Sequence, residues 1–485
     1  MRKNIADKIF IILVFCIVIL PFAGMAFHMT TEPVGNSPLK DKPQLTGEDG
    51  SFNIGFLKDA GDWFESVYAF RPEMITADSL VQKAVYNVSS QDNVISGRQN
   101  WLFYQATVND YTAQEPLSDR MIFNIASNIA LLQRYVDSKG ADMVFTIAPN
   151  KNSLYPEYMP DGYIVTENAK NHERLAALIR SSDINYLDLY SLFTDARSAS
   201  ADNAPLYYAR DSHWNEEGAV MVYEQLMQAA GQVYASDRLQ IADAPAAAAD
   251  MYGDLSLMLY PAGILPEERG IYIPEYHWIY TGEAADVTAN YVETANDSAA
   301  IRAKLVMYRD SFGNSLLPYF AETFESGVFS QTMPYPIDND MGEGTGLVIV
   351  EIVERHLSSL AKAAPLHNAL RAEFTPDAAH PDDRYLEDPE NDSTIRKSRN
   401  KGYTVFEGKL DKAYLAPDSR IYVLTGSGAC FEAYCIRSGG SDYGYSIAFS
   451  EEQLASEGGL PIYVAVPDKD DPEQMIILCK YSESD

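Results

Sequence analysis

Residues 304–316 read KLVMYRDSFGNSL, an apolar run followed by a polar turn and the start of a helix. The run at 305–308 predicts a buried strand. Such a strand–turn–helix unit is typical of parallel α/β sheets, whose ligand crevices lie outside the carboxyl ends of the strands. Ser311 is therefore predicted at the edge of a sheet where a ligand can reach its hydroxyl.

Ser311 is a candidate nucleophile because of the groups expected around it. The N-terminus of the following helix carries unpaired N–H groups that can stabilise an oxyanion. We expect the backbone N–H groups near Ser311 and Phe312 to do so, while Gly313 permits close approach. Arg309 lies just before the turn, where it can contact substrate or pair with a surface acid. The alternative is that Ser311 only caps the helix, a common role of serine at such a position.

A second motif, YYARDSHWNEEG, occupies residues 207–218. In an extended loop, residues two apart point the same way, so Asp211 can accept a hydrogen bond from His213 Nδ1 and leave Nε2 for a nucleophile. Asn215 and the two glutamates after it are typical of a helix N-terminus, which ties the loop to a rigid element. The alternative is that His213 is a partly buried polar side chain and that Asp211 caps a turn.

Helical and strand patterns alternate along the central part of the chain, which predicts an α/β fold. Helices are expected at 121–139, 167–181, 216–230, 311–325 and 354–362. Strands are expected at 142–148, 185–188, 304–308 and 346–352, after a hairpin at 94–104. Residues 245–300 form a long insertion to which these patterns assign no role.

The Asp-Ser-His-Trp sequence at 211–214 and the Asp-Ser-Phe-Gly sequence at 310–313 together resemble the SGNH-like family that includes alginate O-acetyltransferases and the bacterial DHHW proteins. Ser212 stands where the DHHW motif has a histidine, which marks a variant of the motif but leaves the base in place. Weaker matches extend the resemblance over residues 55–362, at 61–64, 70–71, 96–97, 101–104, 150–156 and 351–357.

The resemblance implies an SGNH-like (flavodoxin-like) parallel sheet flanked by helices, with Asp211, His213 and Ser311 as a catalytic triad. It implies transfer or removal of an acyl group, often acetyl, on an extracytoplasmic glycan, and this chemistry requires no metal or organic cofactor. Asn150 and Lys151 follow a predicted strand, so they can reach the same crevice as oxyanion donor or substrate contact. Solvent-exposed loop residues would fit the same pattern.

The N-terminus predicts a single transmembrane helix. An uncharged run extends from Ile9 to Phe27 after three basic residues. At about 1.5 Å per residue, this run approaches the roughly 30 Å hydrocarbon core of a bilayer. The basic side should stay cytoplasmic, which places the remaining chain outside the cell membrane. The alternative is a signal peptide that is cleaved near the small-x-small sequence at 24–26.

Composition divides the chain into five expected segments. They are a membrane anchor at 1–29, a tether at 30–50, an SGNH-like catalytic domain at 51–375, an acidic linker at 376–400 and a small β-rich domain at 401–485. The last segment contains short apolar or alternating runs that predict a small β-sandwich or barrel. These runs lie at 403–406, 420–424, 431–436, 445–449, 462–466 and 475–480.

The net charge of −32 argues against a nucleic-acid partner, because a phosphate backbone would be repelled. A neutral polysaccharide meets no such barrier. The family resemblance implies an extracytoplasmic O-acyltransferase that acts on a cell-envelope polysaccharide, with a membrane-bound acyl-exporting protein as the source of the acyl donor, and the charge is compatible with this expectation. Two alternatives stay open: a carbohydrate esterase with the same triad, and a non-catalytic cell-wall-binding or assembly protein.

Overall fold

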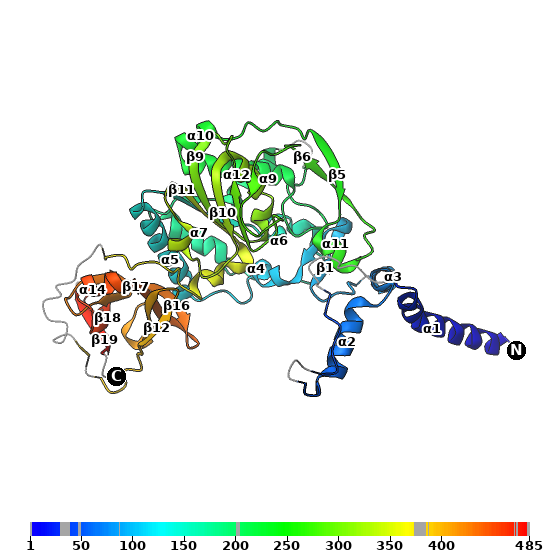
Figure 1. The fold of residues 1–485 in the computed structure, drawn as a ribbon, viewed down its shortest axis with the longest axis horizontal. Helices are drawn as coiled ribbons and strands as arrows, with labels where there is room; N and C mark the ends of the chain where they lie inside the picture. Colours follow the sequence, from blue (N-terminus) through cyan, green and yellow to red (C-terminus); the bar gives the residue numbers. More distant parts are fainter. Residues whose placement is uncertain are drawn as a thin grey trace.

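The chain forms an N-terminal group of helices, a central α/β domain and a C-terminal β domain, with the two termini at opposite ends of the molecule (Figure 1). A computed structural model describes residues 2–29, 39–46, 50–86, 88–199, 204–372, 385–386, 388–469, 471 and 474–482. Most of the tether and much of the acidic linker, at 30–38, 47–49, 373–384 and 387, therefore lie outside the described residues.

A seven-stranded mixed sheet in the order β4-β3-β11-β9-β10-β8-β7 is the centre of the α/β domain. Its strands are β3 (Asp142–Ala148), β4 (Tyr186–Leu187), β7 (Ile279–Tyr280), β8 (Tyr291–Ala295), β9 (Ile301–Tyr308), β10 (Phe324–Ser330) and β11 (Thr345–Val353). The strands from β4 to β10 are parallel, as predicted, whereas β8 and β7 add an antiparallel edge. Antiparallel edge strands on a parallel sheet are common, and here the insertion supplies them.

Helices cover both faces of this sheet because successive strand residues point to opposite sides. One face packs on α8 (Leu189–Ala199), α9 (Glu216–Ala230) and α12 (Leu317–Thr323), and Leu305 and Met307 of β9 point into that layer. Val306 and Tyr308 point to the other face, which packs on α5 (Asp119–Ser138) and α7 (Asn171–Arg180). The four expected helices at 121–139, 167–181, 216–230 and 354–362 are confirmed, the last as the 3-10 helix η5 (Glu354–Ala361).

The predicted helix at 311–325 is wrong in its extent. A short 3-10 helix, η4 (Ser311–Asn314), comes first; α12 begins at Leu317 and ends at Thr323, and β10 begins at Phe324. Pro318 lacks an N–H and is tolerated only in the first turn of a helix, so it forces a new helix start. The β10 strand is buried on both faces over most of its length, so it shows no alternation that would have identified it as a strand.

The insertion folds into a small side layer next to the sheet. It contains an antiparallel pair, β5 (Ala247–Met251) and β6 (Glu267–Ile271), with α11 (Asp254–Leu259) between the two strands. The α11 helix packs on the confirmed hairpin of β1 (Val94–Ser96) and β2 (Leu102–Tyr104). The insertion is thus attached to the hairpin whose Leu102 N–H bonds the second motif at Ala209 O.

Two four-stranded sheets form the C-terminal domain, in the orders β12-β13-β17-β16 and β15-β14-β18-β19. The strands are β12 (Arg396–Asn400), β13 (Tyr403–Lys409), β14 (Tyr422–Leu424), β15 (Cys430–Glu432), β16 (Tyr434–Ser438), β17 (Ser441–Ser450), β18 (Ile462–Pro467) and β19 (Met475–Tyr481). Both sheets contribute to one apolar core, as in a β-sandwich. The strand predicted at 431–436 is divided at Ala433 between the two sheets, and β12 lies inside the segment predicted as linker.

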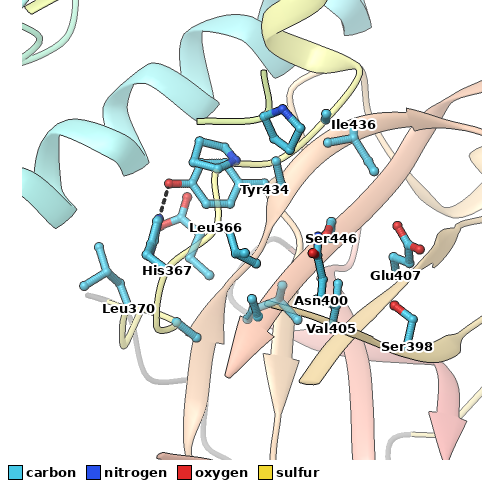
Figure 2. Close-up of a pocket in the computed structure, with 18 of the residues that line it drawn as sticks. Leu366, His367, Leu370, Ser398, Asn400, Val405, Glu407, Tyr434, Ile436 and Ser446 are labelled. Atoms are coloured by element: carbon cyan, nitrogen blue, oxygen red, sulfur yellow. Dashed lines mark hydrogen bonds between the residues drawn. The ribbon is translucent and has the colours of Figure 1, made fainter. Parts of the chain in front are cut away.

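The β domain docks on α5 through buried polar contacts. Asn128 of α5 donates to Cys435 O at 2.9 Å and accepts from Cys435 N at 2.9 Å. A cavity of about 180 Å³ lies between residues 362–370 and the sheet of β12, β13, β16 and β17 (Figure 2). His367 stacks on Tyr135 at this junction and bonds the hydroxyl of Tyr434, and burial lowers the pKa of His367 to about 4, so the imidazole is neutral.

The N-terminal helix α1 (Arg2–Ala26) is long and apolar enough over Ile5–Ala26 to cross a membrane. It is followed by α2 (Phe56–Val67) and α3 (Arg71–Tyr86), and Phe22 of α1 stacks on Phe64 of α2 with ring centres 5.1 Å apart. The remaining short helices are α4 (Val108–Thr112), α6 (Lys151–Leu154), α10 (Gln232–Asp237), α13 (Ile337–Asp340) and α14 (Glu451–Ser456).

Candidate active site

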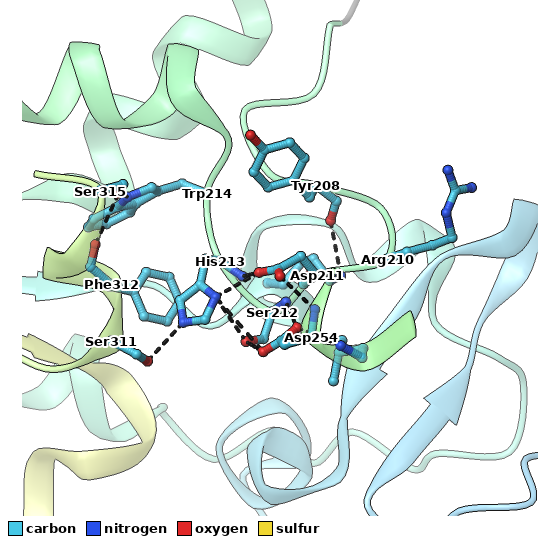
Figure 3. A network of polar contacts seen from close by, with 12 residues as sticks. Tyr208, Arg210, Asp211, Ser212, His213, Trp214, Asp254, Ser311, Phe312 and Ser315 are labelled. Carbon is cyan, nitrogen blue, oxygen red and sulfur yellow. Dashed lines mark hydrogen bonds and ion pairs between the residues drawn. The ribbon is translucent and has the colours of Figure 1, made fainter. Parts of the chain in front are cut away.

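Ser311, His213 and Asp211 form one hydrogen-bonded chain (Figure 3). His213 Nε2 lies 2.8 Å from Ser311 Oγ, and His213 Nδ1 lies 2.6 Å from Asp211 Oδ1. Ser311 follows the carboxyl end of β9, whereas the other two residues belong to the loop before α9. The fold therefore brings together residues 98 positions apart in the sequence, at the sheet edge where a crevice was predicted.

The electrostatics of the pair suit a general base. Burial alone would raise the pKa of Asp211, but the charge of His213 and the N–H groups that Asp211 accepts hold that pKa well below its usual value. Burial alone would lower the pKa of His213, yet the neighbouring Asp211 carboxylate raises it above 6.5. Asp211 is thus ionised, and it holds the Nδ1 proton so that Nε2 faces the serine hydroxyl.

Asp310 organises the turn that carries Ser311. Its Oδ1 accepts from Phe312 N at 2.9 Å, its Oδ2 accepts from Val353 N at 2.7 Å, and its carbonyl accepts from Gly313 N at 3.2 Å. The Phe312 N–H, one of the two groups expected to face an oxyanion, therefore donates to Asp310 in this structure, as does the Gly313 N–H. The Ser311 N–H has no acceptor among the described residues, which leaves it as the backbone donor beside the nucleophile.

Phe312 and Gly313 also shape the site through packing. The Phe312 ring is fully buried and meets the His213 ring edge-on, with centres 4.8 Å apart. A Cβ on Gly313 would lie 2.6 Å from Arg309 Cβ, so only glycine fits against that side chain. Arg309 is 4% exposed, and its guanidinium donates to the carbonyls of Val287 and Ala289, which places it as a strut toward the insertion rather than in the crevice.

Lys151 and Asn150 lie behind the site. The buried Lys151 ammonium donates to the carbonyls of Tyr208, Ala209 and Asp211 at 3.1, 3.0 and 2.5 Å, so it holds the loop that carries the base. Burial lowers the pKa of Lys151 to about 8. Asn150 is 1% exposed and donates through Nδ2 to Asp110 Oδ2 at 3.2 Å. Asn150 Oδ1 also accepts from Arg355 at 3.5 Å, so Asn150 is linked to a side chain at the site, whereas the described hydrogen bonds of Lys151 go to the backbone of the loop.

Two functional candidates were not anticipated from sequence. Asp254, at the start of α11, approaches His213 Nδ1 to 3.9 Å. Arg355, just after β11, lies with its guanidinium 5.6 Å from the ring centres of both Tyr104 and Phe312. Asp254 belongs to no local motif. Arg355 lies inside the weak family match at 351–357 and directly after a predicted strand, and these two signals could have drawn attention to it.

Asp211, His213 and Asp254 place three possible ligand atoms within 4.8 Å of one another. The carboxylate oxygens already accept hydrogen bonds: Asp211 from His213 and from Asp254 N, and Asp254 from the N–H and hydroxyl of Ser212. This arrangement is that of an imidazole held by hydrogen-bonded carboxylates, and we assign no metal to it.

Comparison with known proteins places residues 94–268 in a match to the SGNH hydrolase-like domain of the acetyltransferase AlgX. This match includes Asp211 and His213 and ends before Ser311. The probable alginate O-acetylase AlgJ of Pseudomonas syringae pv. tomato is 26% identical over 142 residues, which are 29% of this chain and 34% of that protein. The chain thus spans about a third of the length of this relative.

Two solved structures align with the chain at low similarity. Bacillus cereus PatB1 is 14% identical with a TM-score of 0.41, over 55% of this chain and 97% of that one. A DHHW family protein from Eubacterium siraeum is 15% identical with a TM-score of 0.38, over 50% of this chain and 90% of that one. The match of residues 94–268 gives the central part of the chain an SGNH-like domain that is similar to those of the alginate O-acetyltransferases.

Proposed function

We propose that this protein is an extracytoplasmic O-acyltransferase that transfers an acyl group, most simply acetyl, to a cell-surface polysaccharide. The observation that carries the proposal is the hydrogen-bonded chain from Ser311 through His213 to Asp211. The similarity of residues 94–268 to the domain of an acetyltransferase supports the reaction class. The similarity to probable alginate O-acetylases supports a polysaccharide as the acceptor.

The reaction proceeds in two steps on Ser311. The Ser311 oxygen attacks the carbonyl carbon of the acyl donor while its proton moves to His213 Nε2, and the Ser311 N–H stabilises the oxyanion. The leaving group departs with the proton from His213. A sugar hydroxyl then gives its proton to His213 and attacks the acyl-enzyme, and Ser311 recovers its proton as it leaves. Asp211 stabilises the imidazolium in both steps.

The placement of the enzyme follows from α1. In this proposal α1 crosses the cell membrane once, residues 30–50 act as a tether, and the domain at 51–375 works outside, near a membrane protein that supplies the acyl donor. In the same proposal the residues at 376–400 form a linker, and the β domain at 401–485 lies outside the membrane with the catalytic domain. The long apolar span of Ile5–Ala26 and the extracytoplasmic character of polysaccharide acylation support it.

Labelling with an activated acyl ester tests the nucleophile. We expect intact mass spectrometry of the full chain to show one acyl adduct, absent from Ser311→Ala and present in the control Ser181→Ala, whose serine is exposed and far from the site in sequence. Loss of Ser311 should lower turnover by about a thousandfold or more. Unchanged labelling of Ser311→Ala would refute the proposal.

The fate of the adduct distinguishes a transferase from an esterase. An acyl-enzyme that is resolved faster by an added oligosaccharide than by water, with the acyl group recovered on the sugar, supports transfer. Release of the free acid at a rate independent of the oligosaccharide would instead identify an esterase with the same triad.

A further inference from the structure

The loop that carries His213 is held in part by groups outside it. Lys151 donates to the carbonyls of residues 208, 209 and 211. Glu267 of β6 accepts the N–H groups of Ala209 and Arg210, each at 2.8 Å. The N–H of Ser256 donates to Arg210 O at 3.0 Å. Two of these three partners come from the insertion, to which the sequence patterns assigned no role.

The insertion approaches this loop as closely as backbone atoms allow. A Cβ on Gly253 would lie 2.5 Å from Arg210 O and 2.8 Å from Asp211 Cβ, so a side chain at this position would push the two segments apart. The next residue is Asp254, whose N–H donates to Asp211 Oδ2 at 2.7 Å. The glycine thus permits a contact that brings a second carboxylate behind the base.

The Asp254 carboxylate is bound to the motif through Ser212. Its Oδ1 accepts from Ser212 N at 2.7 Å and its Oδ2 accepts from Ser212 Oγ at 2.5 Å, while Ser212 Oγ lies 3.3 Å from His213 Nδ1 (Figure 3). Oδ2 lies 3.9 Å from that same nitrogen. The residue at which this chain departs from the DHHW pattern is therefore the one that ties Asp254 to the base.

We propose that Asp254 is a positioning residue of the acyl-transfer site: it fixes Asp211 and Ser212 against the insertion and adds a second negative charge behind His213. The effect of Asp254 on acyl transfer rests on the proposed function. Its effect on the pKa of His213 does not. The charged groups that face His213 are Asp211 on its own loop, Asp254 from the insertion and Arg355 after β11. The two carboxylates favour the protonated imidazole, and the guanidinium opposes it.

The inference is tested by measuring the pKa of His213 by NMR, with histidine-labelled full-length protein in detergent. The His213 resonance is assigned by its loss in His213→Gln. Asp254→Asn should lower the pKa of His213 by about one unit, because a charge about 4 Å away is removed. The matched control Asp250→Asn, an exposed carboxylate of β5, should leave it unchanged. An unchanged pKa in Asp254→Asn would overturn the inference, whether or not the protein transfers acyl groups.

Two further variants separate charge from structure. Ser212→Ala removes the hydroxyl donor but keeps the Asp254 charge, so the pKa of His213 should not fall. Asp254→Glu keeps the charge on a longer side chain, so the pKa of His213 in this variant should stay close to that in wild type. This variant serves as the test if Asp254→Asn folds poorly. A fall in Asp254→Glu or in Ser212→Ala equal to that in Asp254→Asn would show a purely structural role and overturn the inference.

Activity gives the second arm. If the wild-type protein forms the acyl-enzyme, Asp254→Asn should move the acid limb of kcat/KM to lower pH, because the charge that it removes lies 3.9 Å from His213 Nδ1. The KM should change little, because the effect acts through His213. Failure of the proposed function would appear instead as a wild-type protein that forms no adduct, while the His213 pKa difference between wild type and Asp254→Asn persists.

Discussion

Replacing Lys151 with methionine removes a buried ammonium and leaves a side chain of similar length in its place. In the native structure the ammonium donates to three carbonyls of residues 208–211 and lies over the rings of Trp101 and Phe103. The Ala209 carbonyl keeps a second donor, the N–H of Leu102, at 2.8 Å. The other two carbonyls lose the only described donor to them, so the loop that carries the base should relax.

The magnitude follows from two opposing contributions. Hydrogen bonds from a charged donor contribute about 1.5–3 kcal/mol each, so three contribute about 5–9 kcal/mol. Burial of the ammonium opposes this: the pKa of Lys151 falls from 10.5 to about 8, and at about 1.36 kcal/mol per pKa unit this fall corresponds to about 3 kcal/mol. We therefore expect Lys151→Met to lower the free energy of unfolding by about 2–6 kcal/mol at neutral pH.

The pH dependence has a definite sign. Because the folded pKa of about 8 lies below the ordinary 10.5, the unfolded chain binds more protons between these two values. The cost of burying the ammonium is fully present below pH 8 and is relieved as the pH rises toward 10.5. Wild type should thus gain stability relative to Lys151→Met by about 3 kcal/mol over this interval.

Matched thermal unfolding of wild type, Lys151→Met and the exposed control Lys412→Met, at several pH values in one detergent, measures both effects. Acyl transfer in the same samples should show kcat about a hundredfold lower with KM nearly unchanged, since a displacement of about 1 Å is enough. A Lys151→Met protein with wild-type stability and a raised KM alone would refute this reasoning and make Lys151 a substrate contact.

Two other predictions concern the site and the domain contact. Arg355→Met should raise the pKa of His213 and move the acid limb of kcat/KM to higher pH, because the guanidinium opposes the protonated imidazole; a shift to lower pH would contradict the assignment, and Arg355→Lys should keep the wild-type profile. Asn128→Leu should lower the free energy of unfolding by about 2–4 kcal/mol, since it removes both hydrogen bonds to the backbone of Cys435 and leaves that backbone unpaired. Limited proteolysis should then release the β domain earlier than in wild type, and equal rates would argue against the contact.

Local sequence patterns were enough to predict much of the α/β domain. The strand at 142–148 and the helix at 216–230 have the predicted bounds, because apolar periodicity and capping residues act over a few neighbouring positions. The strand at 324–330 was missed because both of its faces are buried. The edge strands β7 and β8 of the insertion were missed because the pairing that adds them to the sheet depends on the distant strand β10.

For the site, the sequence by itself determined which groups are the candidates for the chemistry. Asp211 and His213 lie two residues apart, and Ser311 follows a predicted strand, so their types and local geometry are visible without a fold. The tertiary structure alone decided what holds them. Lys151 lies 60 residues before Asp211 and Asp254 lies 43 after it, and hydrogen bonds over such separations leave no local pattern. It also decided that the Phe312 N–H donates to Asp310, since a hydrogen-bond partner is selected by packing in three dimensions and not by neighbouring sequence.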